Sequence, residues 1–382
     1  MQIEIPSIRS EAYRSKLRPK HSNIWRATVV AALLLVSAAG FGFAQTSIDP
    51  DAAFLPSPVR IVSTVPKNGD ENPYGVAFVP NNFQTGTGSL AHGDILVSNW
   101  NNSSNLQGTG TTIVRVPPSG NPSTFFQGKA GLGLSTALGV LQYGFVLVGN
   151  SPTTDGTSAT AKPGSLLVIN SKGQLLQTFT SSWIQGPWDM ALVDNGDQAF
   201  VFLSNSFTGA VVRLNFTVSP TKGLTWVNTT TIASGYFVSG NPATVFIAPT
   251  GLVYDAVHNI LYVASTGDNA VFAVWNATTR TTDGGMGEIV YQDDLHLHGA
   301  LGLAMAPNGH LLVTNNDAVN PSSSQPSEIV EFTTEGTFVK EIPVDPGQGG
   351  AFGLAVSVNG SQATFAAVDD VNNTLIIWTL NL

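Results

Sequence analysis

The sequence predicts an all-β protein, a six-bladed β-propeller built from four-stranded antiparallel blades. Three observations support this fold class. A strand pattern of about fifty residues recurs six times along the chain, which is the size of one propeller blade. Its short apolar strands are separated by Gly, Asn and Pro, the residues that tight turns require. The composition agrees, since only 11% of the residues are charged and the chain contains 39 Gly and 22 Pro.

Residues 1–44 differ from the rest of the chain and predict a secretory signal peptide. Six Lys and Arg residues come before an apolar run, Ala27–Ala44, that ends with the small residues Gly42 and Ala44. A basic leader, an apolar core and small residues before the cut are typical of a peptide cleaved after Ala44. The alternative is an uncleaved membrane anchor, because about 18 apolar residues can just span a bilayer. We expect cleavage and a secreted protein, either extracellular or periplasmic.

The remaining chain is acidic, which restricts its partners. Without residues 1–44 it has 10 basic and 23 acidic residues, a net charge of −13. So few Lys and Arg residues provide no basic surface for nucleic acid or anionic lipid. Cysteine is absent, which excludes disulfides, thiolate metal sites and a Cys nucleophile. We therefore expect a small polar ligand, a glycan or a protein as partner, with no nucleic acid and no membrane after cleavage.

Residues 45–58 form a short polar linker that contains Pro, and the propeller is expected over residues 59–382. The first strand of this range, Val59–Val65, has no hairpin partner before it.

Six repeat units then follow, and each opens with a small apolar strand that carries a Gly or, once, an Asp. A spacing of 64, 50, 62, 51 and 51 positions indicates radial repetition with two insertions. The aligned residues are Gly75, Gly139, Asp189, Gly251, Gly302 and Gly353.

A second strand follows each opening strand, and a third follows after a loop. The second strands are expected at Asp94–Ser98, Phe145–Gly149, Ala199–Ser204, Ile260–Ala264, His310–Thr314 and Ala363–Val368. The third strands are expected at Thr112–Val116, Ser165–Ile169, Ala210–Leu214, Ala270–Val274, Glu328–Phe332 and Thr374–Trp378.

The sixth unit has no fourth strand of its own. We expect Val59–Val65 to supply it by pairing with Thr374–Trp378. This pairing would close the ring of blades and cover a sheet edge that would otherwise be exposed.

The repeat resembles the NHL type of six-bladed propeller. The segments GLAMAPNGHLLVTNN (residues 302–316) and GLVYDAVHNILYVASTGDNAVFAV (residues 251–274) follow the Gly-Leu-Ala, turn, Leu-x-Val, polar pattern of that family. The resemblance covers about residues 59–382. It implies the fold but no single function, because the class includes ligand-binding scaffolds, lactonases and lyases.

The start of each opening strand and the end of each second strand share one edge of the sheet, because the two strands are antiparallel. The opening strand is expected to be innermost, so this edge borders the mouth of the central channel. We therefore predict a site there. Aromatic side chains next to a ring of amides suit a sugar or another neutral polar ligand. The alternative is architectural, since an Asn repeated in four blades can bond backbone groups at the turn. The candidate ligand-binding residues are Tyr74, Asn99, Asn150, Trp188, Asn205, Asn315, Phe352 and Asp369.

No cofactor is expected, although a divalent metal is possible at Glu71, His296 and His298. Alternation places the two imidazoles on one side of an extended segment, beside Asp293 and Asp294. The alternative is a pair of loop histidines bonded to backbone carbonyls.

Gluconolactonase-like propellers provide the comparison with an enzyme. As a family they hold a divalent cation in the channel with a Glu, one or two Asn and an Asp. Glu71-Asn72-Pro73-Tyr74 resembles the Glu-Gly-Pro segment of that family, so the resemblance implies Glu71 as a ligand. At two further ligand positions this chain has Trp188 and Thr250, which departs from the pattern. We therefore favour a binding protein that uses the channel-mouth face over the alternative, a metal-dependent hydrolase or lyase.

Overall fold

The computed structural model describes residues 54–55, 60–84, 88–315, 320–322, 324 and 327–382. The chain divides into two units, Met1–Gln45 and Thr46–Leu382. The first unit, with the expected signal peptide, lies outside the described residues, as does most of the expected linker. In the described part of the chain, no helix is both long and apolar enough to cross a membrane.

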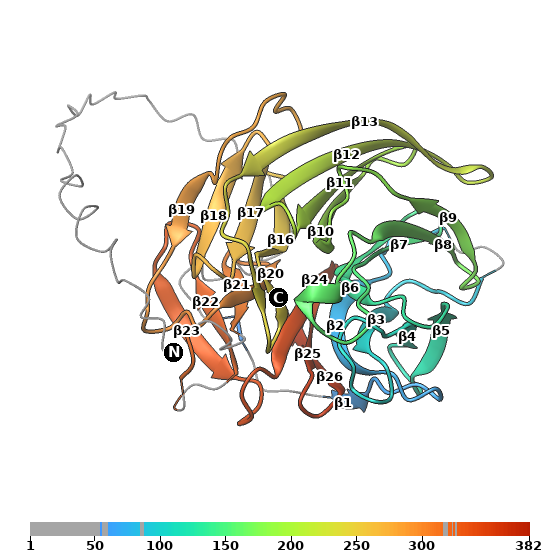
Figure 1. Ribbon diagram of the computed structural model, residues 1–382, viewed down its shortest axis with the longest axis horizontal. Coiled ribbons are helices and arrows are strands. Elements are labelled where there is room, and N and C mark those ends of the chain that lie inside the picture. Colours follow the sequence, from blue (N-terminus) through green and yellow to red (C-terminus); the bar gives the residue numbers. More distant parts are fainter. Residues whose placement is uncertain (1–53, 56–59, 85–87, 316–319, 323, 325–326) are drawn as a thin grey trace, which may run out of the picture. The chain divides into compact units, whose positions relative to one another are not determined.

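The second unit is all-β and contains six four-stranded antiparallel sheets that follow one another around a ring (Figure 1). This confirms the fold class. The first three blades are β2–β5 (Glu71–Phe78, Ile95–Asn101, Thr112–Val116, Ser123–Gln127), β6–β9 (Leu134–Leu141, Phe145–Asn150, Ser165–Asn170, Leu175–Phe179) and β10–β13 (Pro187–Asp194, Gln198–Asn205, Ala210–Ser219, Gly223–Ser234). The next two are β16–β19 (Pro249–Asp255, Ile260–Ser265, Ala270–Trp275, Glu288–Tyr291) and β20–β23 (Ala300–Met305, Leu311–Asn315, Glu328–Phe332, Phe338–Pro343).

The sixth blade combines strands from both ends of the described chain. Its inner strands are β24 (Ala351–Asn359), β25 (Gln362–Asp369) and β26 (Thr374–Asn381), and β1 (Arg60–Ser63) is the outermost. Arg60 lies opposite Ile377, and Ser63 lies opposite Thr374. The outer edge of β26 therefore has a partner strand.

Close approach of neighbouring blades explains the glycines at the aligned positions. A Cβ added to Gly353 would lie 1.8 Å from the carbonyl oxygen of Tyr74 in the first blade, and one on Gly302 would lie 2.3 Å from the carbonyl oxygen of Phe352. Both distances are far below a van der Waals contact. Only Gly lets the inner strands approach this closely, so the repeat marks contacts between blades.

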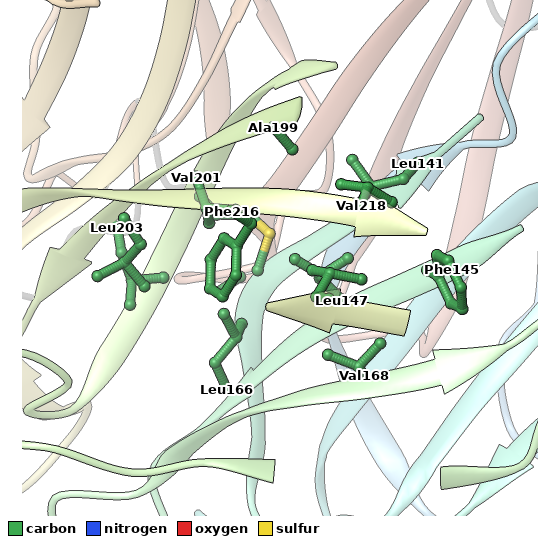
Figure 2. Close-up of a cluster of buried hydrophobic side chains, with 14 of the residues drawn as sticks. Leu141, Phe145, Leu147, Leu166, Val168, Ala199, Val201, Leu203, Phe216 and Val218 are labelled. Atoms are coloured by element: carbon green, nitrogen blue, oxygen red, sulfur yellow. The ribbon is translucent and has the colours of Figure 1, made fainter. Parts of the chain in front are cut away.

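Most of the apolar core lies between neighbouring blades. Figure 2 shows the cluster between the second and third blades, where Leu147 and Leu166 meet Val201 and Phe216. All four side chains are buried. Each such side chain stabilises the fold by about 1.5–3 kcal/mol through removal of apolar surface from water. The period-2 alternation along each strand thus joins neighbouring sheets face to face.

The sequence prediction did not include a hairpin and a short helix that the structure describes. A small hairpin joins the third and fourth blades and consists of β14 (Ser239–Asn241) and β15 (Val245–Ile247). A short 3₁₀ helix, η1 (Ser158–Thr160), lies in the loop between β7 and β8. The hairpin also contributes to the site described next.

Candidate functional site

Three predicted aromatic residues form a buried plug at the channel mouth. The rings of Tyr74 and Phe352 stack with centroids 4.1 Å apart, and the ring of Tyr74 also stacks with Trp100 at 5.5 Å. Trp188 meets Trp100 edge to face at 5.1 Å. Tyr74 and Trp188 are each only 2% exposed, and Phe352 is 5% exposed. Most of this aromatic surface is therefore used in packing.

The hairpin β14–β15 completes the plug. Val245 is fully buried in the same cluster, and the ring of Phe246 packs against Trp188 at 5.9 Å and against Phe207 at 5.0 Å. Val245 has a φ of 63°, a conformation in which a β-branched residue is strained. The packing of the plug therefore holds the hairpin in a backbone conformation that its own sequence disfavours.

A pocket of about 500 Å³ lies beside the plug, between the first and sixth blades and the hairpin. Tyr74, Phe352 and Pro321 form most of its apolar part. Amide side chains, one carboxyl group and the hairpin tip form the rest. The lining residues are Asn72, Tyr74, Asn101, Asn105, Gln107, Ala243, Thr244, Pro321, Gln348, Gly349, Phe352 and Asp370.

The amides of the first blade leave hydrogen-bond acceptors unused. The Asn101 side chain donates to Oδ1 of Asn105 at 2.5 Å, and Gln107 Nε2 donates to the carbonyl oxygen of Ala243 at 2.8 Å. The oxygens Asn72 Oδ1, Asn101 Oδ1 and Gln107 Oε1 are buried, and none has a hydrogen-bond partner among the described residues. Because an unpaired buried acceptor costs about 1–3 kcal/mol, three of them around one pocket suggest a missing donor.

Asp370 supplies the carboxyl group of the pocket. Its side chain accepts no hydrogen bond from any residue that the structure describes, and its backbone N–H donates to Gly350. Burial, together with the nearby charges of Asp369 and Asp345, raises the pKa of Asp370 well above its ordinary value. The pKa of Tyr74 is also well above its usual range, mainly through burial and next through Asp370. The two groups therefore disfavour additional negative charge in this pocket.

The four predicted asparagines bond to the segments that lead into the inner strands. Nδ2 of Asn99 donates to Thr64, that of Asn150 to Leu132, that of Asn205 to Trp183 and that of Asn315 to His296, all at backbone oxygens. None of the four lines the pocket. The four side chains thus bond backbone groups within the blades, as the architectural interpretation of the repeated Asn describes.

Asp369 also lies outside the pocket, one residue from Asp370. It is buried, and Asn372 donates to it from both its backbone N–H and its side chain. Burial is the main cause of the raised pKa of Asp369, and the charge of Asp345 adds to it.

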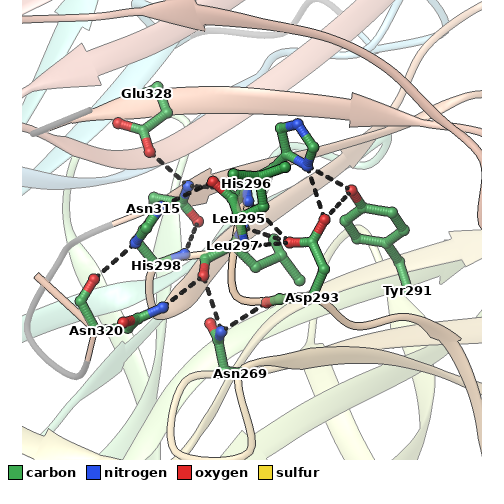
Figure 3. A network of polar contacts seen from close by, with 10 residues as sticks. All are labelled: Asn269, Tyr291, Asp293, Leu295, His296, Leu297, His298, Asn315, Asn320 and Glu328. Carbon is green, nitrogen blue, oxygen red and sulfur yellow. Dashed lines mark hydrogen bonds and ion pairs between the residues drawn. The ribbon is translucent and has the colours of Figure 1, made fainter. Parts of the chain in front are cut away.

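The histidine segment lies on the connection between the outermost strand of the fourth blade and the innermost strand of the fifth. Figure 3 shows the polar contacts of this segment. His296 Nδ1 is 2.7 Å from Oδ2 of Asp293, and its ring stacks on Phe338 of the outer strand β23. His298 is buried, with Nδ1 2.8 Å from the backbone oxygen of Asn320. Its Nε2 is 3.2 Å from the backbone oxygen of Leu295. The side chains of both histidines thus contact groups of their own and neighbouring loops, and the ring of His296 packs against an outer strand.

The metal site of gluconolactonase-like propellers does not fit these residues. Trp188 is buried in the plug, and the Thr250 hydroxyl lies 2.9 Å from the carbonyl oxygen of Leu301. Glu71 starts β2, and His296 and His298 are engaged in the loop contacts described above. In the described ranges, no group of three or more His, Cys, Asp or Glu side chains is placed to hold a metal ion.

Sequence reasoning missed most of the pocket. Asn72 and Asp370 are each one residue away from a predicted position, Glu71 and Asp369, and Asn101 is two residues from Asn99. The register of β2 and β3 shifts between Pro73 and Val76. Such a bulge changes which side chains of β2 and β3 face the same side, and the positions of the strand ends do not predict this.

No protein-family model matches the chain, and no curated protein matches it. Similarity appears among solved structures. The gluconolactonase XC5397 from Xanthomonas campestris has a TM-score of 0.51 and 12% identity, over 84% of this chain and 90% of its own. The α-L-arabinofuranosidase Arb93A from Fusarium graminearum, in complex with an iminosugar inhibitor, has a TM-score of 0.51 and 11% identity, over 85% of this chain and 98% of its own.

This chain shares their propeller fold. The likeness extends over most of both chains, so the propeller corresponds as a whole ring rather than as a few blades. At this level of identity it shows the fold alone.

Proposed function

We propose that this propeller is a secreted binding protein whose channel-mouth pocket takes a small, neutral, hydroxyl-rich ligand such as a sugar. The observation that carries the proposal is the set of unpaired acceptors on Asn72, Asn101 and Gln107. A ligand would reach these buried oxygens after rotation about the last side-chain torsion, which has a broad energy well. A ligand with several hydroxyl donors would satisfy them.

The charge of the pocket supports a neutral ligand. Its described lining contains Asp370 and no Lys or Arg. A phosphate or carboxylate would therefore find no cationic partner there, and it would face the acidic remainder of the chain. Sugars also present apolar C–H groups, which can contact the apolar lining that Tyr74 and Phe352 provide.

The pocket favours binding over catalysis. Glycoside hydrolysis uses a pair of carboxyl groups, and Asp370 is the one carboxyl in the described lining. The gluconolactonase and the arabinofuranosidase with this fold are named for sugar chemistry, which agrees with the proposed ligand class. No feature of the pocket assigns their activities to this chain.

Isothermal titration calorimetry with glucose and arabinose, and with glucuronate as an anionic counterpart, tests the proposal. Gln348 lines the pocket and is exposed, so Gln348→Ala should weaken binding of the neutral sugars without loss of stability. The matched control is Gln198→Ala, which changes an exposed glutamine at the start of β11. Binding of glucuronate in preference to both neutral sugars, or equal effects of the two variants, would contradict the proposal.

A further inference from the structure

We propose that the sixth blade carries a calcium site formed by Asp345, Asp369, Asn372 and Ser327, beside the pocket and separate from it. These residues come from three segments that meet at Gly350. Val344 N–H donates to the backbone oxygen of Ser327, and Asp370 N–H donates to that of Gly350. The site therefore joins the start of β22 to the β23–β24 connection and to the β25–β26 turn.

The two carboxyl groups share one amide. Nδ2 of Asn372 donates to Oδ2 of Asp345 and, at 2.9 Å, to Oδ2 of Asp369. The amide nitrogen thus contacts both buried carboxyl groups, so the two carboxyl groups face a common neighbour. Rotation of this amide by half a turn would direct its oxygen toward the two carboxyl groups, and an ion held among the three groups would then have a third oxygen ligand.

Ser327 is the independent observation that points to a ligand. Its hydroxyl is fully buried and has no hydrogen-bond partner in the described part of the chain. A Cβ placed on Gly350 would lie 3.1 Å from Ser327 Oγ, 3.2 Å from Asp369 Oδ1 and 3.3 Å from Asp345 Cβ. The unpaired hydroxyl and the carboxyl group of Asp369 therefore border one small space that a side chain at residue 350 would fill, with Cβ of Asp345 on another side of it.

The charge balance of this region favours a cation. Asp370 lies next to the site, and the charges of Asp345 and Asp369 both act on it. None of the three aspartates forms a salt bridge to a Lys or Arg that the structure describes. Two carboxylates, an amide oxygen, a hydroxyl and water are a donor set that calcium accepts, because it tolerates six to eight oxygen ligands in irregular geometry.

Calcium here would hold one wall of the pocket. Asp345 Oδ1 accepts from the N–H of Gly347, and the next two residues, Gln348 and Gly349, line the pocket. Binding the ion would tie residues 344–350 to residues 369–372. The inference does not depend on the ligand of the pocket, since the ion is tested alone.

The test uses the full chain after treatment with EDTA. Unfolding temperatures are compared in CaCl₂, in MgCl₂ and in NaCl of the same ionic strength, and titration calorimetry with CaCl₂ gives the affinity and stoichiometry. We expect one calcium ion per chain, a higher unfolding temperature in CaCl₂ than in NaCl, and a smaller response to MgCl₂. An equal unfolding temperature in CaCl₂ and NaCl would overturn the proposal.

Variants locate the ion. Asp345→Asn and Asp369→Asn should each weaken calcium binding at least about tenfold, whereas Asp197→Asn, an exposed aspartate in the β10–β11 turn, should leave it unchanged. Ser327→Ala removes a hydroxyl without a partner, so it should fold and bind about fivefold more weakly. If the aspartate variants fail to fold, unchanged affinity in Ser327→Ala overturns the site. Retained affinity in folded Asp345→Asn and Asp369→Asn would do the same.

Discussion

Ser204 Oγ donates a 2.8 Å hydrogen bond to the backbone oxygen of Thr250, and so joins the third blade to the fourth. The same hydroxyl accepts from the N–H of Asp189 in its own blade. Ser98 makes the equivalent pair of bonds in the first blade, to Gly75 and Ser135. Thr314 does so in the fifth, to Gly302 and Phe352. One buried hydroxyl thus connects two inner strands at three joints of the ring.

We predict that Ser204→Ala destabilises the propeller by about 1–3 kcal/mol, because it leaves two buried backbone groups without their partner. The measurement is the free energy of unfolding in urea. Ser361→Ala changes an exposed serine in the β24–β25 turn and should stay within about 0.5 kcal/mol of the wild type. A similar small effect for Ser204→Ala would mean that the hydroxyl does not join the blades energetically.

The pH dependence of stability should contain a contribution from Asp189. Burial raises its pKa to about 8, although the N–H groups of Leu252 and Met190 donate to it. Below about pH 4 the Asp189 carboxyl is protonated in both the folded and the unfolded state, so its ionisation does not change the free energy of unfolding. As the pH rises toward 8, the unfolded chain loses this proton while the folded chain retains it, so the folded state becomes progressively less favourable.

Asp189→Asn removes this titration but also one hydrogen-bond acceptor. We expect the variant to unfold at a lower temperature than the wild type near pH 4, and the difference to shrink or reverse toward pH 8. Unfolding temperatures of both proteins across this range measure it. Asp197→Asn, at an exposed position, should run parallel to the wild type. Parallel curves for Asp189→Asn would contradict the prediction.

Removal of residues 45–66 should lower the unfolding temperature far more than trimming of an ordinary terminus. The deletion removes β1 and leaves an edge of β26 unpaired. It also removes Phe54 and Leu55, which are buried in the apolar cluster of the fifth and sixth blades. The N–H of Phe54 bonds to the buried Glu331 as well. An unchanged unfolding temperature would show that the ring is stable without this segment.

Cleavage after Ala44 is the prediction for the leader. The exported protein should begin at Gln45 and should be recovered without detergent, because the basic leader and the apolar run are removed together. N-terminal sequencing and mass spectrometry of the exported product measure this. Recovery only in the membrane fraction, with Arg9 and the other leader residues retained, would instead indicate an uncleaved anchor.

The sequence by itself determined the strand repeat, because each blade needs the same turn residues and the same alternation of buried side chains. It also marked Gly302 and Gly353, where neighbouring inner strands approach too closely for a Cβ. The pocket was decided only in the tertiary structure. All six innermost strand pairs have a register shift near their aligned residue, so counting by two does not tell which side chain faces the channel mouth. Asn72, Gln107, Ala243 and Asp370 meet there because closing the ring brings the first and sixth blades and the hairpin together, and no local pattern encodes that encounter.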